Sequence, residues 1–112
     1  MIDRIHPDAE EELYQAAIWY EEQEAGVGLR LLAEFDDARK RIADRAGRLP
    51  LLETMPFDRD IRRTFLKRFP FMVVCELFSA EDVILAVAHA GRKPCYWSDR
   101  RPRSGGFQPP IK

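Results

Sequence analysis

The chain has 112 residues, of which 46% are hydrophobic and 33% charged, and its formal net charge is −1. This composition predicts one folded domain rather than a disordered chain. No apolar run approaches the ~20 residues of a membrane span, the first residues lack the apolar stretch of a signal peptide, and two cysteines are too few for a disulfide framework. We therefore expect a single cytoplasmic domain over residues 1–100, followed by a flexible tail over 101–112.

The first part of the chain predicts a short strand and two helices. Ile2–Ile5 suits a strand, and Pro7 suits the first turn of a helix. Apolar residues then recur every three or four positions as far as Tyr20, which predicts one buried helical face. A turn over 24–28 contains two glycines and should separate this helix from a second one over 29–46. The two helices should form an antiparallel hairpin.

The second part predicts three strands, at residues 61–66, 71–78 and 83–90, with a hairpin loop over 79–82. The last two strands have no polar face, so they should lie at the centre of the sheet and be covered on both sides. The period of two places four side chains on one face of the last strand, namely Val83, Leu85, Val87 and His89. Helices that precede a run of antiparallel strands predict an α+β fold.

Charge is divided unevenly along the chain. Residues 1–58 hold 7 basic and 14 acidic side chains, a net charge of −7, whereas residues 59–103 hold 10 basic and 5 acidic, a net charge of +5. This division suggests that the second half meets an anionic partner, although charges can also segregate on a surface that only faces water.

Five short motifs along the chain resemble those of one protein family. They are His6 to Leu13, the turn from Trp19 to Gly28, the pair Arg62-Arg63, the segment Phe69-Pro70-Phe71, and the C-terminal motif Ala86 to Arg100. Together, and in this order, they resemble the RelE/ParE family of toxins from type II toxin–antitoxin modules, over roughly Ile5 to Arg100.

The resemblance implies a fold and a set of partners. The fold would be an N-terminal strand and a helical hairpin packed on a small antiparallel sheet. Such toxins act in plasmid stabilisation and growth inhibition, require no cofactor and no membrane, and are neutralised by a cognate antitoxin in heterotetrameric or larger complexes. ParE-like members inhibit DNA gyrase, whereas RelE-like members cut messenger RNA in the ribosomal A site.

Metal-independent RNA cleavage needs a proton acceptor, a proton donor and cations near the phosphate. By resemblance to RelE-like nucleases, the candidate catalytic residues are Arg92 and Tyr96, with Arg63 near a lysine position of those nucleases. His89 is a further candidate, because the ordinary pKa of histidine, about 6.5, suits a general base. A lone histidine at the end of an apolar strand is, however, more often structural. The widely spaced cysteines and histidines predict no metal site.

Two positions depart from the nuclease pattern. Met72 and Phe65 stand where the nucleases carry an arginine and a lysine, and neither can offer positive charge or a proton. Losing a positioned acid or base typically costs ~10²–10⁴ in rate. The incomplete set favours the ParE-like, gyrase-binding reading over an endoribonuclease. A non-toxic interaction or nucleic-acid-binding domain is a further alternative.

The residues expected to bind a partner form a basic and aromatic set, because arginine and aromatic side chains make good protein hot spots. They are Arg62, Arg63, Lys67, Arg68, Arg92, Tyr96, Trp97 and Arg100. The four residues from Arg92 onward also have a structural alternative: Trp97 would pack over the sheet edge, and Arg92 and Arg100 would pair with Asp99 or with helix carboxylates. We expect Tyr14 and Trp19 to pack in the core or against a helix rather than to belong to a site, and Glu10, Glu11 and Glu12 to be solvated charges of the first helical turns.

Overall fold

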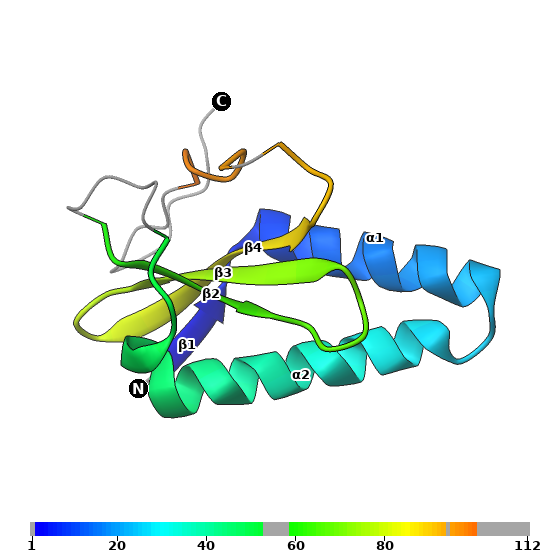
Figure 1. Cartoon of the computed structure of the whole chain (residues 1–112), viewed down its shortest axis with the longest axis horizontal. Coiled ribbons are helices and arrows are strands. Elements are labelled where there is room, and N and C mark those ends of the chain that lie inside the picture. The colour runs from blue at the N-terminus through cyan, green and yellow to red at the C-terminus, as the bar shows by residue number, and fades with distance from the viewer. Residues whose placement is uncertain (1, 53–58, 94, 101–112) are drawn as a thin grey trace.

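The computed structural model describes residues 2–52, 59–93 and 95–100, and Figure 1 shows the arrangement of their elements. The predicted tail over 101–112 lies outside the described residues. The elements in chain order are β1 (Ile2–Ile5), α1 (Pro7–Gln23), α2 (Val27–Arg45), a short 3₁₀ helix (Ala46–Arg48), β2 (Ile61–Phe65), β3 (Phe71–Leu77) and β4 (Glu81–His89). This order confirms the predicted strand, helical hairpin and three strands.

The four strands form one sheet in the order β1-β4-β3-β2, so β3 and β4 are central as predicted. Strand β3 is antiparallel to both of its neighbours, β2 and β4, but β1 pairs with β4 in parallel, from Ile2 opposite Glu81 to Ile5 opposite Ile84. The prediction of an antiparallel sheet is therefore wrong at β1. A parallel pair needs a long crossover connection, and the helical hairpin with β2 and β3 supplies it. The fold is α+β with a mixed sheet.

A β-bulge interrupts the ladder between β3 and β4. The register shifts between Val74 and Cys75, which leaves Leu85 without a partner across the ladder. As a result Leu85 and Ala86 both pack on the sheet face away from the helices, while Val87 packs on the helix face. A bulge adds one residue to one strand and so inverts the alternation beyond it. The structure thus corrects the prediction of a single face for Val83, Leu85, Val87 and His89.

The sheet is covered on both faces, as predicted for its central strands. One face carries the helical hairpin, whose buried stripes include Leu13 of α1 and Leu31 of α2. The other face is covered by the closing segment over 95–100, in which Trp97 is 1% exposed (Figure 1). The closing segment therefore completes the second core of the domain.

The helices are joined at a turn that the carboxylate of Glu21 holds. Glu21 accepts hydrogen bonds from the backbone N–H groups of Gly26 at 2.9 Å and Gly28 at 3.0 Å. Helix α2 begins at Val27, earlier than predicted, so Gly28 does not break the helix. A methyl group at Gly28 would instead overlap the backbone oxygen of Ala17, which explains a glycine at this crossing.

Candidate functional site

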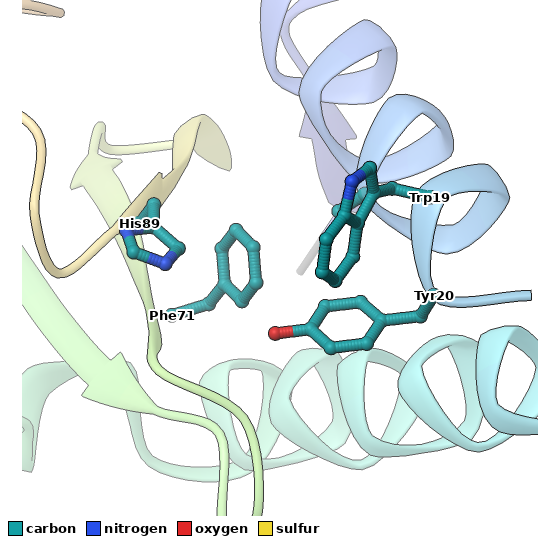
Figure 2. Close-up of a pocket in the computed structure, with 5 residues that line it drawn as sticks. Trp19, Tyr20, Phe71 and His89 are labelled. Carbon is teal, nitrogen blue, oxygen red and sulfur yellow. The ribbon is translucent and has the colours of Figure 1, made fainter. Parts of the chain in front are cut away.

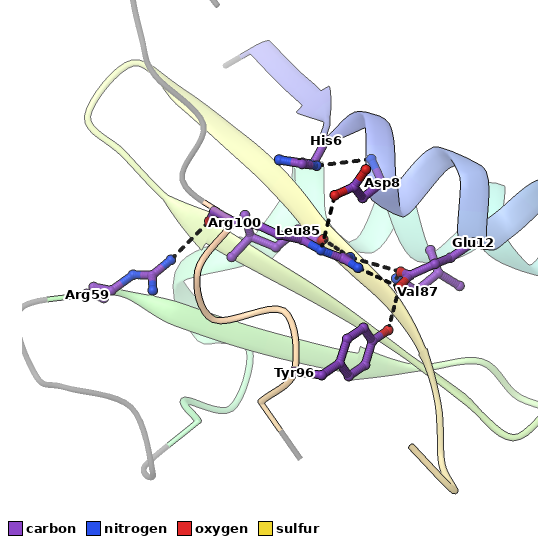
Figure 3. Close-up of polar contacts among 8 residues, drawn as sticks. All are labelled: His6, Asp8, Glu12, Arg59, Leu85, Val87, Tyr96 and Arg100. Atoms are coloured by element: carbon purple, nitrogen blue, oxygen red, sulfur yellow. Dashed lines mark hydrogen bonds and ion pairs between the residues drawn. The ribbon is translucent and has the colours of Figure 1, made fainter. Parts of the chain in front are cut away.

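Three polar side chains meet beside β4 and bring together the two ends of the described chain (Figure 3). The carboxylate of Glu12 on α1 accepts a hydrogen bond from the Tyr96 hydroxyl at 2.7 Å. Arg100 donates to both oxygens of this carboxylate, at 3.1 and 2.8 Å. We call these three residues the Glu12 cluster. Glu12 and Arg100 are 88 positions apart in the sequence.

The Glu12 cluster also satisfies backbone groups of β4 that no strand reaches. The pairing of β1 with β4 ends where Ile5 lies opposite Ile84. Beyond that point the N–H of Val87 donates to Glu12 at 3.0 Å, and Arg100 donates to the carbonyl of Leu85 at 2.9 Å. Unpaired backbone groups at a covered sheet edge are costly. The side chains of Glu12 and Arg100 therefore make the hydrogen bonds to the β4 backbone that a longer β1 would make.

These contacts set the charge state of the cluster. Burial alone would raise the pKa of Glu12, but the hydrogen bonds from Arg100, Tyr96 and the Val87 N–H outweigh it and lower this pKa below its ordinary value. Burial and the bond to Glu12 together raise the pKa of Tyr96. Burial would lower the pKa of Arg100, but its bond to Glu12 raises it. Glu12 and Arg100 therefore stay charged, and Tyr96 stays a neutral donor.

The closing segment is held from its other side by Arg59. The guanidinium of Arg59 donates to both carboxylate oxygens of Glu76, at 3.1 and 2.8 Å, and to the carbonyl of Ser98 at 2.6 Å. The Arg59 and Glu76 side chains are 7% and 8% exposed. With the Glu12 cluster, this buried pair fixes the closing segment against both the sheet and α1.

Several predicted binding residues are used inside the fold. Trp97 is buried in the second core, which corrects its prediction as a binding residue in favour of packing. Arg62 donates to Asp60 at 2.7 Å and to the carbonyls of Gly47 and Leu49 at 2.8 and 2.9 Å. Together with Arg100, these residues hold elements together and do not present a free contact surface.

The other predicted residues gather where β2 and β4 end and β3 begins. We call this region the cationic end; its exposed basic residues are Lys67, Arg68, Arg92 and Lys93. Phe65, 55% exposed, pairs across the strands with Met72, and the guanidinium of Arg63 lies 5.4 Å from the Phe65 ring centroid. A hollow of about 230 Å³ is lined by Phe65, Met72, Arg92 and Tyr96 among others. The centre of this surface is thus apolar.

The candidate acid–base groups are not free for catalysis. The hydroxyl of Tyr96 points to Glu12, and the guanidinium of Arg92 covers the Tyr96 ring at 3.7 Å from its centroid. His89 is exposed, and its Nδ1 accepts the N–H of Gly91 at 2.9 Å. The Tyr96 hydroxyl and the Nδ1 of His89 are therefore both engaged in hydrogen bonds within the chain.

Sequence reasoning missed the roles of Glu12 and Arg59. Glu12 follows Ala9 by three positions and precedes Ala16 by four, so it lies beside the buried stripe of α1. This spacing is the feature of the sequence that could have indicated that Glu12 faces the sheet. The prediction that Tyr14 and Trp19 pack in the core is wrong, because they are 49% and 55% exposed. Both lie outside the stripe of α1 that faces the sheet.

Comparison with known proteins leaves the chain without an assigned family. No family model matches it, and no curated protein matches it significantly. Among the described residues, no three His, Cys, Asp or Glu side chains are grouped so that they could hold a metal ion. No helix in the described ranges is long and apolar enough to cross a membrane.

Proposed function

We propose that this chain is the toxin of a type II toxin–antitoxin module, and that it inhibits growth by binding DNA gyrase as ParE-like proteins do. In this proposal a cognate antitoxin neutralises it in the cytoplasm. The resemblance of its motifs to the RelE/ParE family supports the proposal, and the α+β architecture with a helical hairpin is compatible with it.

One observation favours a binding protein over a nuclease: the Tyr96 hydroxyl donates a hydrogen bond to Glu12 at 2.7 Å. A nuclease would need this group to exchange a proton with RNA. Its raised pKa disfavours the phenolate, and the lowered pKa of Glu12 makes that carboxylate a weak proton acceptor. Tyr96 instead attaches the closing segment to α1 through Glu12.

The surface at the cationic end suits contact with a protein. Phe65 and Met72 stand where a nuclease would need cations, and they line the hollow together with Arg92 and Lys93. The guanidinium of Arg63 lies over the Phe65 ring. An exposed aromatic group beside arginine side chains is typical of an interface hot spot. The charge of the surrounding residues would steer the approach of an acidic partner.

The test is a supercoiling assay with purified chain and gyrase. We expect inhibition at micromolar protein and a loss of roughly tenfold or more with Phe65→Glu, since truncated hot spots cost about 2 kcal/mol. Leu29→Glu is the matched control, because Leu29 is 69% exposed at the start of α2 and does not line the hollow of the cationic end, and this variant should inhibit as the wild type does. Unimpaired supercoiling at micromolar wild-type protein would refute the proposal.

The same protein can be tested for the other two functions. Cleavage of messenger RNA on translating ribosomes that disappears with Arg92→Ala would replace gyrase binding by a RelE-type endoribonuclease. Normal growth after induction without an antitoxin would favour a non-toxic interaction domain. Either result contradicts the proposal above.

A further inference from the structure

An open groove runs between α1 and the end of the sheet where β3 begins and β4 ends. It consists of two adjoining hollows of about 290 and 390 Å³, which share Ala16, Phe71 and His89 in their linings. Trp19 and Tyr20 complete the first hollow. The bulge in β4 is the reason that His89 lies on this side of the sheet, against Phe71.

The first hollow is an aromatic box (Figure 2). The rings of Trp19 and Tyr20 meet edge to face at 5.0 Å and 89°, and those of Tyr20 and Phe71 at 6.4 Å and 70°. His89 stands at 85° to Phe71, with 5.2 Å between the ring centroids. Figure 2 shows the Trp19 and Phe71 rings on either side of a gap, with the Tyr20 ring below it. Edge-to-face contacts of this kind are the usual packing of aromatic side chains, but here the rings also line an open hollow, and the face of an aromatic ring attracts a cation.

Trp19 forms the outer wall of the box and is not itself covered. Its side chain is 55% exposed, whereas Trp97 in the second core is 1% exposed. A large apolar ring left in water beside a hollow marks a binding surface more than a single exposed aliphatic residue does. The indole is therefore placed to close over a ligand.

The charge beside the box favours a cation. Helix α1 carries six acidic residues and no lysine or arginine. Glu12 and Asp8 already face Arg100, and Glu21 holds the turn between the helices. The exposed carboxylates that remain are those of Glu10, Glu11 and Glu22. Glu11 lines the second hollow and contacts the neutral amide of Gln15 at 2.9 Å, so its charge remains available. Arg92 also lines the second hollow, where its guanidinium is stacked on Tyr96, but it does not line the box. The aromatic rings of the box and the carboxylate of Glu11 in the adjoining hollow complement a positive, planar group.

We propose that the box receives an arginine side chain from a segment of a partner protein that lies along α1. A planar guanidinium stacks on aromatic faces better than an ammonium group does, and the chain itself makes this contact where Arg92 lies 3.7 Å from the Tyr96 centroid. The acidic side of the groove, with Glu11, would face the rest of a basic segment. That the partner is the antitoxin rests on the proposed function; the arginine site does not.

The test follows the two indole N–H signals of the full chain by NMR during titration with a capped Ala-Arg-Ala peptide. Trp19 should shift and saturate, while the buried Trp97 should not move and serves as an internal control. The citrulline analogue keeps the shape without the charge and should bind roughly fivefold or more weakly, because a cation on an aromatic face contributes about 1 kcal/mol. Equal binding of the citrulline or of a norleucine analogue would overturn the proposal.

Two variants separate the box from the rest of α1. Trp19→Ala should abolish the response of the remaining box residues, read from Tyr20 and His89, and its exposed position keeps the fold intact. Tyr14→Ala removes a similarly exposed ring elsewhere on α1 and should leave binding unchanged. Binding that survives Trp19→Ala would refute the site. If the peptide binds while gyrase is unimpaired, the proposed function alone fails; if gyrase is inhibited and the peptide does not bind, the arginine site alone fails.

Discussion

Replacing Glu12 by glutamine removes one negative charge from the Glu12 cluster and changes little in size. The native carboxylate accepts four hydrogen bonds: one from Tyr96, one from the Val87 N–H and two from Arg100. Glutamine has one acceptor oxygen, and its NH2 group, itself a donor, would face one of the donors that the carboxylate now binds. At least one donor of the cluster therefore loses its partner.

The size of the effect follows from burial. The side chains of Glu12 and Arg100 are 16% and 14% exposed, so water shields them only in part. Breaking a fully buried pair costs about 3–5 kcal/mol, and losing a hydrogen bond to a charged group costs about 1.5–3 kcal/mol. Asp8, 3.8 Å from Arg100, offsets some of the lost charge. We expect Glu12→Gln to lower the free energy of unfolding by about 2–4 kcal/mol.

Equilibrium unfolding in urea, followed by circular dichroism, measures this difference. Glu11→Gln is the matched control, because Glu11 is exposed and contacts only a side-chain amide in the structure. This control should stay within about 0.5 kcal/mol of the wild type. If Glu12→Gln falls in the same range, the cluster does not stabilise the fold and the reasoning is refuted.

Three further results are expected. Folding lowers the pKa of Glu12, so the ionised carboxylate stabilises the folded chain above the ordinary carboxyl pKa of about 4.3, and this stabilisation is lost as pH falls through the lowered pKa. The difference in the free energy of unfolding between wild type and Glu12→Gln, measured in urea, should therefore shrink at pH 3 and persist at pH 7. Gly28→Ala should lower the free energy of unfolding by about 1–3 kcal/mol through overlap with the backbone of α1, whereas Gly47→Ala, with open space around it, should change it by less than about 0.5 kcal/mol, and equal losses would contradict the close helix crossing. Native Cys75, buried and with its pKa raised to about 12 by burial, should resist iodoacetamide at pH 8 until urea is added; mass spectrometry of the labelled peptides checks this, and rapid native labelling would show that β3 is not covered.

The elements that depend on local pattern could be predicted from the sequence. The apolar stripe of α1 repeats with the helical period and predicted that helix. The largely apolar stretches of β3 and β4, without a polar face, predicted two strands at the centre of the sheet. The direction of β1 could not be predicted, because a four-residue strand carries no signal for its neighbour. The bulge at Leu85 was also missed, since two apolar residues in succession fit either face of a sheet that is covered on both sides.

The sequence predicted which residues belong to the candidate site, but it did not predict what those residues contact. The basic and aromatic residues of the closing segment stand out in the sequence, but only the fold shows that Trp97 is buried and that Arg100 binds Glu12. Glu11 and Glu12 are neighbours of the same type, and the helix turns one to water and the other to β4. Which of the two pairs with Arg100 depends on contacts between distant parts of the chain.

The parallel pairing of β1 also has a consequence for the order in which the chain folds. The first strand finds its partner only at residues 81–84, and Glu12 finds Arg100 only at the end of the described chain. Contacts of such large sequence separation form slowly, because the loop between them must close first. During synthesis the helical hairpin therefore emerges before the strands that cover it, and a chain cut short before residue 100 keeps an uncovered β4 edge. Residues 95–100 complete the described fold, so products truncated before them should be poorly folded and cleared by proteolysis.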